Sequence, residues 1–124
     1  MKSSEEIYKE ATSAFKEFQE FNPSAMNGFL KYVHSSNKDG ALSAKIKQII
    51  LVSVAITKRC EWCIVYHTRK ALELGASREE LMEACLVTSV MDGGPTMMHS
   101  QLVFQTIDEY QREQELLIQT IEEN

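Results

Sequence analysis

The residues best suited to chemistry lie in one short stretch that holds two cysteines and a histidine. Cys60 and Cys63 are three residues apart, and His67 follows four residues after the second cysteine. On a helix, residues three and four apart are neighbours, so all three side chains would share one face. A thiol of a Cys-X-X-Cys pair at a helix N-terminus has its pKa lowered from ~8.5 to roughly 3.5–7.5. Two thiols at this spacing can also close a disulfide, because one resolves the sulfenic acid or mixed disulfide formed on the other.

The histidine adds acid–base chemistry to the pair. His67 can accept, relay or return the proton of Cys63, which would lie one turn before it. The spacing leaves open which cysteine attacks a substrate, since Cys60 gains from the helix start and Cys63 gains from the histidine.

Two alternatives use the same residues differently. The two thiolates and the imidazole could bind zinc, with His99 or Glu61 as the fourth ligand. Structural zinc sites usually draw ligands from two separated elements, however, and the sequence has no second Cys-X-X-Cys or paired-histidine motif. A third interpretation is a decarboxylase or isomerase that uses His67 as its acid–base group and does not need the thiols. We expect a redox pair and no bound metal or other cofactor.

The other residues of chemical interest have simpler interpretations. Cys85 continues an apolar helical stripe, so we expect it in the core. His34 lies near a loop and is expected in solvent, whereas His99 comes early in the last helix and could line a cleft. Trp62 and Tyr66 flank the cysteines and could form the wall of an apolar pocket or lie in an interface.

Composition excludes several classes of protein. The chain has 124 residues, of which 44% are hydrophobic and 25% are charged, with a formal net charge of −5. Its lysines and arginines are scattered, so we expect no nucleic-acid partner. The longest apolar run, Ile49 to Ile56, is shorter than the ~18–20 residues of a membrane span, and no secretory signal is evident. We therefore expect no membrane contact and a cytoplasmic location, where three cysteines do not form a structural disulfide framework.

The elements that must position the cysteines are all predicted to be helices. The five glycines and two prolines cluster at a few breaks, and the segments between them carry helical periodicity. Predicted start and stop signals are Ser3 with Glu6, Asn22-Pro23, Ser43, Gly75, Ser77 with Glu80, and the break Asp92-Gly93-Gly94-Pro95. The β-branched run Ile49 to Thr57 could pass for a strand, but the sequence offers no second strand to pair with it.

These segments predict an all-α bundle of about six helices in one domain, residues 1–124. In the second helix, we expect Met26, Phe29, Leu30 and Val33 to face inward. Ile46 to Ile56 and Leu81 to Met91 are apolar over more than one face, which predicts association into a homo-oligomer.

Four segments carry a family resemblance. They are Leu42-Ser43-Ala44-Lys45-Ile46-Lys47-Gln48-Ile49-Ile50, Cys60-x-x-Cys63-x-x-x-His67, Gly75-Ala76-Ser77-x-Glu79-Glu80 and Met91-x-Gly93-Gly94-Pro95. In this order and spacing, the region from Leu42 to Tyr110 resembles the carboxymuconolactone decarboxylase family, within it the alkylhydroperoxidase AhpD-like branch.

The resemblance implies an all-helical AhpD-like fold that assembles as a homotrimer or homohexamer. It implies a thiol-dependent peroxidase or disulfide reductase whose Cys-X-X-Cys pair cycles between dithiol and disulfide. The substrate would be a peroxide or a disulfide, and an external dithiol or thioredoxin-like donor would reduce the pair, without a bound cofactor. Ring-lactone decarboxylation belongs to members that lack the pair, so we do not expect it here.

The branch also implies a proton relay, from which this chain departs at one position. The second cysteine, the histidine four residues on and a glutamate twelve residues before the first cysteine share the relay. Cys60, Cys63 and His67 match, but Gln48 stands at the position of the glutamate. Glutamine can orient a partner by hydrogen bonding but cannot take up a proton. Trp62 likewise stands where the branch often has histidine. We therefore expect peroxidase activity to be slow or absent, with disulfide exchange less affected.

Overall fold

The computed structural model of the protein describes all residues from 1 to 124, and it consists of six helices without strands. They are α1 (Ser4–Phe21), α2 (Pro23–Asn37), α3 (Ala44–Thr57), α4 (Glu61–Glu73), α5 (Arg78–Asp92) and α6 (Gly94–Glu123). The predicted all-α bundle is confirmed, and the β-branched run forms a helix. None of the six helices combines the length and the apolar character needed to cross a membrane.

Side-chain caps start the helices where the sequence predicts them. Ser43 Oγ accepts a hydrogen bond from the Ile46 N–H group at the start of α3. Ser77 and Glu80 form both hydrogen bonds of a capping box at the start of α5. Each cap satisfies N–H groups that have no partner within the helix, so local sequence alone fixes these starting points.

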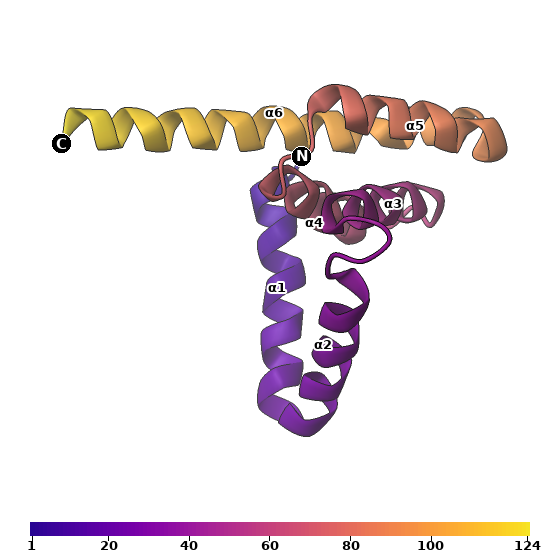
Figure 1. Cartoon of the computed structure of the whole chain (residues 1–124). Coiled ribbons are helices and arrows are strands. Elements are labelled where there is room, and N and C mark those ends of the chain that lie inside the picture. The colour runs from indigo at the N-terminus through magenta and orange to yellow at the C-terminus, as the bar shows by residue number, and fades with distance from the viewer.

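Helix α4 lies among the other elements and packs against α3, α6 and α1. Helices α5 and α6 run side by side across one end of the molecule, and the C-terminal half of α6 extends past the other helices (Figure 1). Helices α1 and α2 form a hairpin that projects away from this layer (Figure 1). The core is built by α3 to α6, and its fully buried large side chains are Val52, Ile56, Ile64, Leu81, Val103 and Ile107.

The inward face predicted for the second helix is only partly correct. Met26 is buried, and Val33 is half-buried, but Phe29 and Leu30 are 51% and 43% exposed. The reason is geometric: α2 packs mainly on α1 and barely touches α3, so the hairpin has no third helix to cover this face.

Candidate active site

The chain enters the site through a tight turn between α3 and α4. Arg59 adopts the left-handed conformation, with φ of 56°, which is the backbone geometry that glycine usually supplies at a helix end. The Cys60 N–H group donates to the Ala55 carbonyl at 3.3 Å, closing the turn. The Arg59 guanidinium donates to the Ile56 carbonyl at 2.7 Å and to the Asp92 carboxylate at 2.8 Å. The turn is therefore held from α3 and from the end of α5.

This turn places Cys60 at the N-cap of α4. Its Sγ accepts a hydrogen bond from the Cys63 N–H group at 3.2 Å. Cys60 and Cys63 form a disulfide whose Cα atoms are 5.3 Å apart, and both residues are half-buried. The helix start expected at Cys60 is confirmed, and a thiolate there would face unpaired N–H groups.

His67 lies one turn further along α4 and contacts α3 through Gln48. His67 Nδ1 and Gln48 Oε1 are 2.9 Å apart. A carbonyl oxygen can only accept, so Nδ1 donates and the free lone pair of the neutral ring is on Nε2. Burial lowers the pKa of His67 to about 4, because the interior disfavours the charged imidazolium. The histidine is neutral near pH 7 and is a weak base.

Two apolar cavities open beside the disulfide. One, of about 190 Å³, is lined by Trp62, Cys63, Tyr66 and His67 of α4, by Ala11 and Phe15 of α1, and by Phe29, Leu30 and Val33 of α2. The second, of about 450 Å³, is lined by Cys60, Cys63 and Trp62 together with Phe15, Ala11, Ala14 and Glu10. Cys63 thus borders both cavities, whereas Cys60 borders only the second. The exposed Phe29 and Leu30 of α2 serve as walls of the first.

A third cavity, of about 380 Å³, lies on the other side of His67 and is polar. It is lined by His34, Asn37, Lys38, Gln48, His67, Lys70, Tyr66, Val33, Ala44 and Leu74. Tyr66, Val33 and His67 border both this cavity and the smaller apolar one. His67 therefore lies at the boundary between an apolar and a basic compartment.

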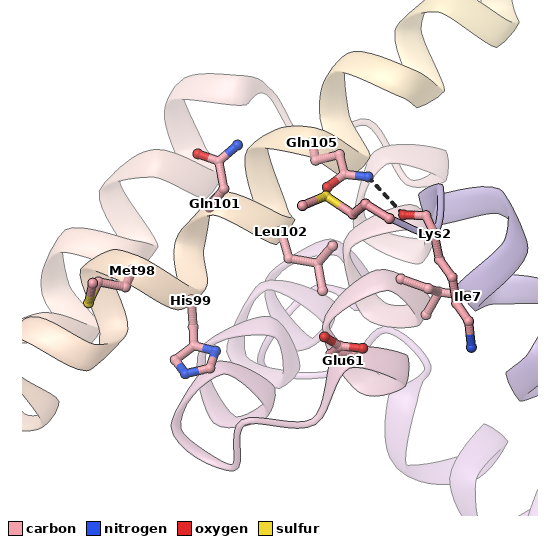
Figure 2. A pocket seen from close by; sticks show the side chains of 9 residues that line it. Lys2, Ile7, Glu61, Met98, His99, Gln101, Leu102 and Gln105 are labelled. Atoms are coloured by element: carbon pink, nitrogen blue, oxygen red, sulfur yellow. Dashed lines mark hydrogen bonds between the residues drawn. The ribbon is translucent and has the colours of Figure 1, made fainter.

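The residues considered as further zinc ligands point elsewhere. Glu61 and His99 border a separate cavity of about 330 Å³ between the N-terminus, the start of α4 and α6 (Figure 2). No three side chains of histidine, cysteine, aspartate or glutamate gather in a geometry that could hold a metal ion. The structure thus gives the zinc interpretation no ligand set. His34 is exposed as expected, and Cys85 is buried, where burial raises the pKa of its thiol.

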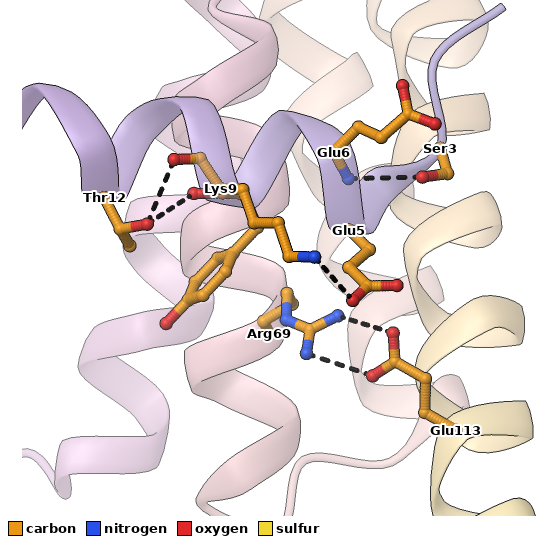
Figure 3. Close-up of polar contacts among 8 residues, drawn as sticks. Ser3, Glu5, Glu6, Lys9, Thr12, Arg69 and Glu113 are labelled. Carbon is orange, nitrogen blue, oxygen red and sulfur yellow. Dashed lines mark hydrogen bonds and ion pairs between the residues drawn. The ribbon is translucent and has the colours of Figure 1, made fainter.

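The far half of α4 is fixed by Arg69. Its guanidinium forms two hydrogen bonds to Glu113 of α6, at 3.3 and 3.1 Å (Figure 3). The same group stacks over the Tyr8 ring of α1, 4.8 Å from its centroid. A partly buried, two-pronged arginine–carboxylate pair of this kind restricts orientation as well as distance. Helix α4 is therefore held at both ends.

Sequence reasoning missed the contribution of α1 to the site. Phe15 lies between the two apolar cavities, and Glu10 accepts a hydrogen bond from Trp62 Nε1 at 3.1 Å. These residues are about fifty positions from the cysteines, and only tertiary packing brings them near. The left-handed backbone of Arg59 could not be predicted either, because an arginine gives no sequence cue for this conformation.

Fold and site together define an all-helical protein in which a Cys-X-X-Cys disulfide lies at the start of a central helix, one turn before a half-buried histidine. A model of the carboxymuconolactone decarboxylase family matches residues 23–105, more than half of the chain. The chain therefore belongs to the carboxymuconolactone decarboxylase family.

Relatives and solved structures agree with this assignment. An uncharacterized protein encoded in the cox locus of Paracoccus denitrificans is 34% identical over 99 residues, 80% of this chain and 89% of that protein. An uncharacterized Cupriavidus necator protein is 37% identical over 78 residues, 63% of this chain and 69% of that protein. The apo crystal structure of a family member from Legionella pneumophila superposes with a TM-score of 0.82 at 33% identity, covering 86% of this chain and 96% of that one. A Thermotoga maritima family member has the same fold, with a TM-score of 0.76 at 23% identity over 87% of this chain and 92% of that one.

Proposed function

We propose that the protein is an AhpD-like oxidoreductase in which Cys60 and Cys63 cycle between dithiol and disulfide while reducing a peroxide or another disulfide. One observation carries the proposal: the Cys60–Cys63 disulfide lies at the N-cap of α4, and Cys63 shares a cavity with His67. A sulfur at a helix N-terminus and a nearby base are what thiolate chemistry requires. The Thermotoga maritima neighbour has been linked to the antioxidative response, which agrees with this class of reaction.

The surroundings of the two sulfurs favour Cys63 as the attacking thiol. It borders the cavity that also holds His67, whereas Cys60 borders only the other apolar cavity. The Cys63 thiolate would attack the distal oxygen of a hydroperoxide, breaking the O–O bond. The products are a sulfenic acid on Cys63 and an alkoxide, which takes a proton and leaves as an alcohol.

Cys60 then resolves the intermediate. Its thiol attacks the sulfur of the sulfenic acid, forming the disulfide and releasing water. An external dithiol supplies two electrons and two protons to restore both thiols and leaves as a disulfide itself. Such a donor belongs to a reducing compartment, so we place the reaction in the cytoplasm.

The relay supports disulfide exchange better than peroxide reduction. Proton transfer from a thiol to His67 is uphill, because the pKa of His67 is about 4. Gln48, its partner at 2.9 Å, cannot take the proton further. Cys63 therefore gains little from His67 as a proton acceptor, and the helix N-terminus acts mainly on the Cys60 sulfur at the N-cap. We expect slow peroxidase turnover and faster reduction of small disulfides.

Trapping the sulfenic acid tests the proposal. In the Cys60→Ser variant, the reduced protein treated with tert-butyl hydroperoxide should carry a dimedone adduct on Cys63, detected by mass spectrometry. The Cys63→Ser variant should give no adduct, and both variants should lose turnover with a dithiol donor. Cys85→Ala serves as the matched control, because Cys85 is buried away from the pair and should not change the result.

Two outcomes would contradict the proposal. If both serine variants retain full turnover, the thiols do not perform the reaction. If the native protein is purified without chelator and holds near-stoichiometric zinc with unreactive thiols, the site is a metal site instead. An adduct on Cys60 in the Cys63→Ser variant, with none on Cys63, would reverse the assignment of the attacking thiol.

A further inference from the structure

The two cavities that meet at His67 differ in character, and this difference bears on the substrate. On the Cys63 side, eight of the nine lining residues are hydrophobic and none carries a formal charge apart from what His67 could acquire. On the Gln48 side, the lining includes Lys38, Lys70 and His34, and no aspartate or glutamate. Together the two cavities form an amphipathic compartment with the reactive cysteine at its apolar end.

The basic cavity says more about the substrate than the apolar one does, because positive charge gathers there although the protein as a whole carries a net charge of −5. Lys38 forms no ion pair with any carboxylate. Lys70 is paired with Glu73 at 3.5 Å, a loose contact, and its Nζ lies 5.5 Å from the centroid of the Tyr66 ring. A local excess of positive charge on an acidic protein attracts anions to that point and not to the surface in general.

A third lysine fixes the segment that carries Lys38. Lys47 Nζ donates to the backbone carbonyls of Ser36, at 2.9 Å, and of Lys38, at 2.7 Å. This arrangement ties the end of α2 to α3 through the backbone of Lys38, whose side chain takes part in neither hydrogen bond. The basic wall is therefore held in place against the helix that carries Gln48.

We propose that the substrate is an anionic amphiphile: a carboxylic acid that bears a hydroperoxide on its acyl chain. The inference rests on the proposed function and names its substrate class. The carboxylate would lie near Lys38 and Lys70, the hydroperoxide beside His67 and Cys63, and the rest of the chain among Phe29, Leu30 and Trp62. Charge-assisted hydrogen bonds to the carboxylate would orient the peroxide for attack.

The reaction balances with this substrate as with a simple hydroperoxide. The distal peroxide oxygen is transferred to Cys63 as the O–O bond breaks, and the proximal oxygen takes a proton. The product is the corresponding hydroxy acid, whose carboxylate is unchanged. Substrate and product therefore carry the same charge. As with a simple hydroperoxide, the external dithiol is the only other reactant.

A hydroperoxy fatty acid and its methyl ester provide a matched pair of probes, since they differ only in the charge of the headgroup. Below the concentration at which either probe forms micelles, we expect the free acid to have a kcat/KM about tenfold higher, the ratio expected from one charge-assisted hydrogen bond. Lys38→Met and Lys70→Met should each reduce this ratio toward one, and Lys70→Arg should restore it. Lys16→Met is the control, because Lys16 is exposed on α1 and borders none of the three cavities.

A binding measurement separates this inference from the proposed function. Trp62 is the only tryptophan and borders the apolar cavity, so its fluorescence should respond to octanoate more strongly than to methyl octanoate. If acid and ester bind and react alike while tert-butyl hydroperoxide is still reduced, the inference is overturned and the proposed function stands. If no peroxide is reduced but octanoate binds in a Lys38-dependent manner, the anion site is supported and the peroxidase proposal fails.

Discussion

At the scale of single residues, the site depends on a histidine that the fold keeps neutral. His67 is half-buried, and its Nδ1–H group donates to Gln48 Oε1 at 2.9 Å. Burial lowers the pKa of His67 to about 4, because the protein interior disfavours the charged imidazolium. Position 48 carries an amide and not a carboxylate of nearly the same shape. The hydrogen bond is therefore kept while the proton acceptor is lost.

Replacing Gln48 by glutamate should restore a proton acceptor. The new carboxylate would lie beside His67 Nδ1 and raise the pKa of the histidine toward its ordinary value. We expect Gln48→Glu to increase the rate of Cys63 oxidation by a hydroperoxide at pH 7 about tenfold, less than the ~10²–10⁴-fold typical of a general base in direct contact with its substrate. Single-turnover oxidation of the reduced protein measures this rate. Gln48→Leu, which supplies neither hydrogen bond nor charge, is the control, and equal rates for the two variants would contradict the argument.

The low pKa of His67 also predicts how stability depends on pH. The unfolded chain binds a proton at His67 below about pH 6.5, whereas the folded protein binds it only below about pH 4. The free energy of unfolding should therefore decrease as the pH falls from about 6.5 to about 4, by up to about 3 kcal/mol. Urea denaturation at several pH values measures this slope. His67→Gln should flatten the slope, and an unchanged slope in this variant would mean that another group is responsible.

At the scale of elements, the turn between α3 and α4 decides where the cysteines lie. Arg59 has a left-handed backbone, which costs a residue with a side chain about 1–2 kcal/mol. Its ion pair with Asp92, at 2.8 Å, opposes this cost and joins the turn to the end of α5. The turn is thus stabilised by a tertiary contact and not by its own sequence.

Two substitutions at Arg59 separate these effects. Arg59→Ala loses the ion pair and keeps the backbone strain, so we expect a loss of about 1–3 kcal/mol of stability. Arg59→Gly also loses the ion pair but relieves the strain, and should be about 1 kcal/mol more stable than the alanine variant. Denaturant unfolding compares the two. Lys58→Ala, at the exposed neighbouring position, should change stability by less than about 0.5 kcal/mol. A glycine variant no more stable than the alanine variant would show that the backbone is not strained.

The helices and their starting residues are the features that could be predicted most fully from the sequence. Caps such as Ser43 and the Ser77–Glu80 box are local, so the residues that define a helix start are neighbours in the chain. The cluster of Cys60, Cys63 and His67 could be predicted for the same reason. Phe15, Phe29 and Arg59 could not, because their positions depend on how distant helices pack. The basic cavity beside Gln48 was likewise invisible, since it joins residues from α2, α3 and α4.

At the scale of the whole molecule, a large apolar surface is left uncovered. On α5, Val87, Val90 and Met91 are 70%, 82% and 93% exposed, and their spacing places them on one face. Met98, at the start of α6, is 79% exposed. Contiguous apolar surface of this kind usually marks an interface. We propose that this face of α5 packs against further copies of the chain in a homotrimer or homohexamer.

A charge on this face tests the assembly. Val90→Glu would bury an unpaired carboxylate in the interface, so we expect the oligomer to dissociate. Size-exclusion chromatography with light scattering should give the mass of a trimer or hexamer for the native protein and of a monomer for the variant. Ser13→Glu, which adds the same charge at an exposed position on α1, should keep the native mass. A native protein that runs as a monomer would contradict the proposal.

The Cys60 sulfur that caps α4 also affects how well ordered the start of this helix is. Cys60 Sγ is at once a redox atom and the acceptor for the Cys63 N–H group, at 3.2 Å. A thermodynamic cycle connects these two roles: whatever free energy the helix contributes to ionising this sulfur, the ionised sulfur contributes to ordering the helix. The first turn of α4 should therefore exchange its amide hydrogens most slowly when Cys60 is an anion. Reduction and pH thus adjust the rigidity of the cavity walls as well as the reactivity of the thiol.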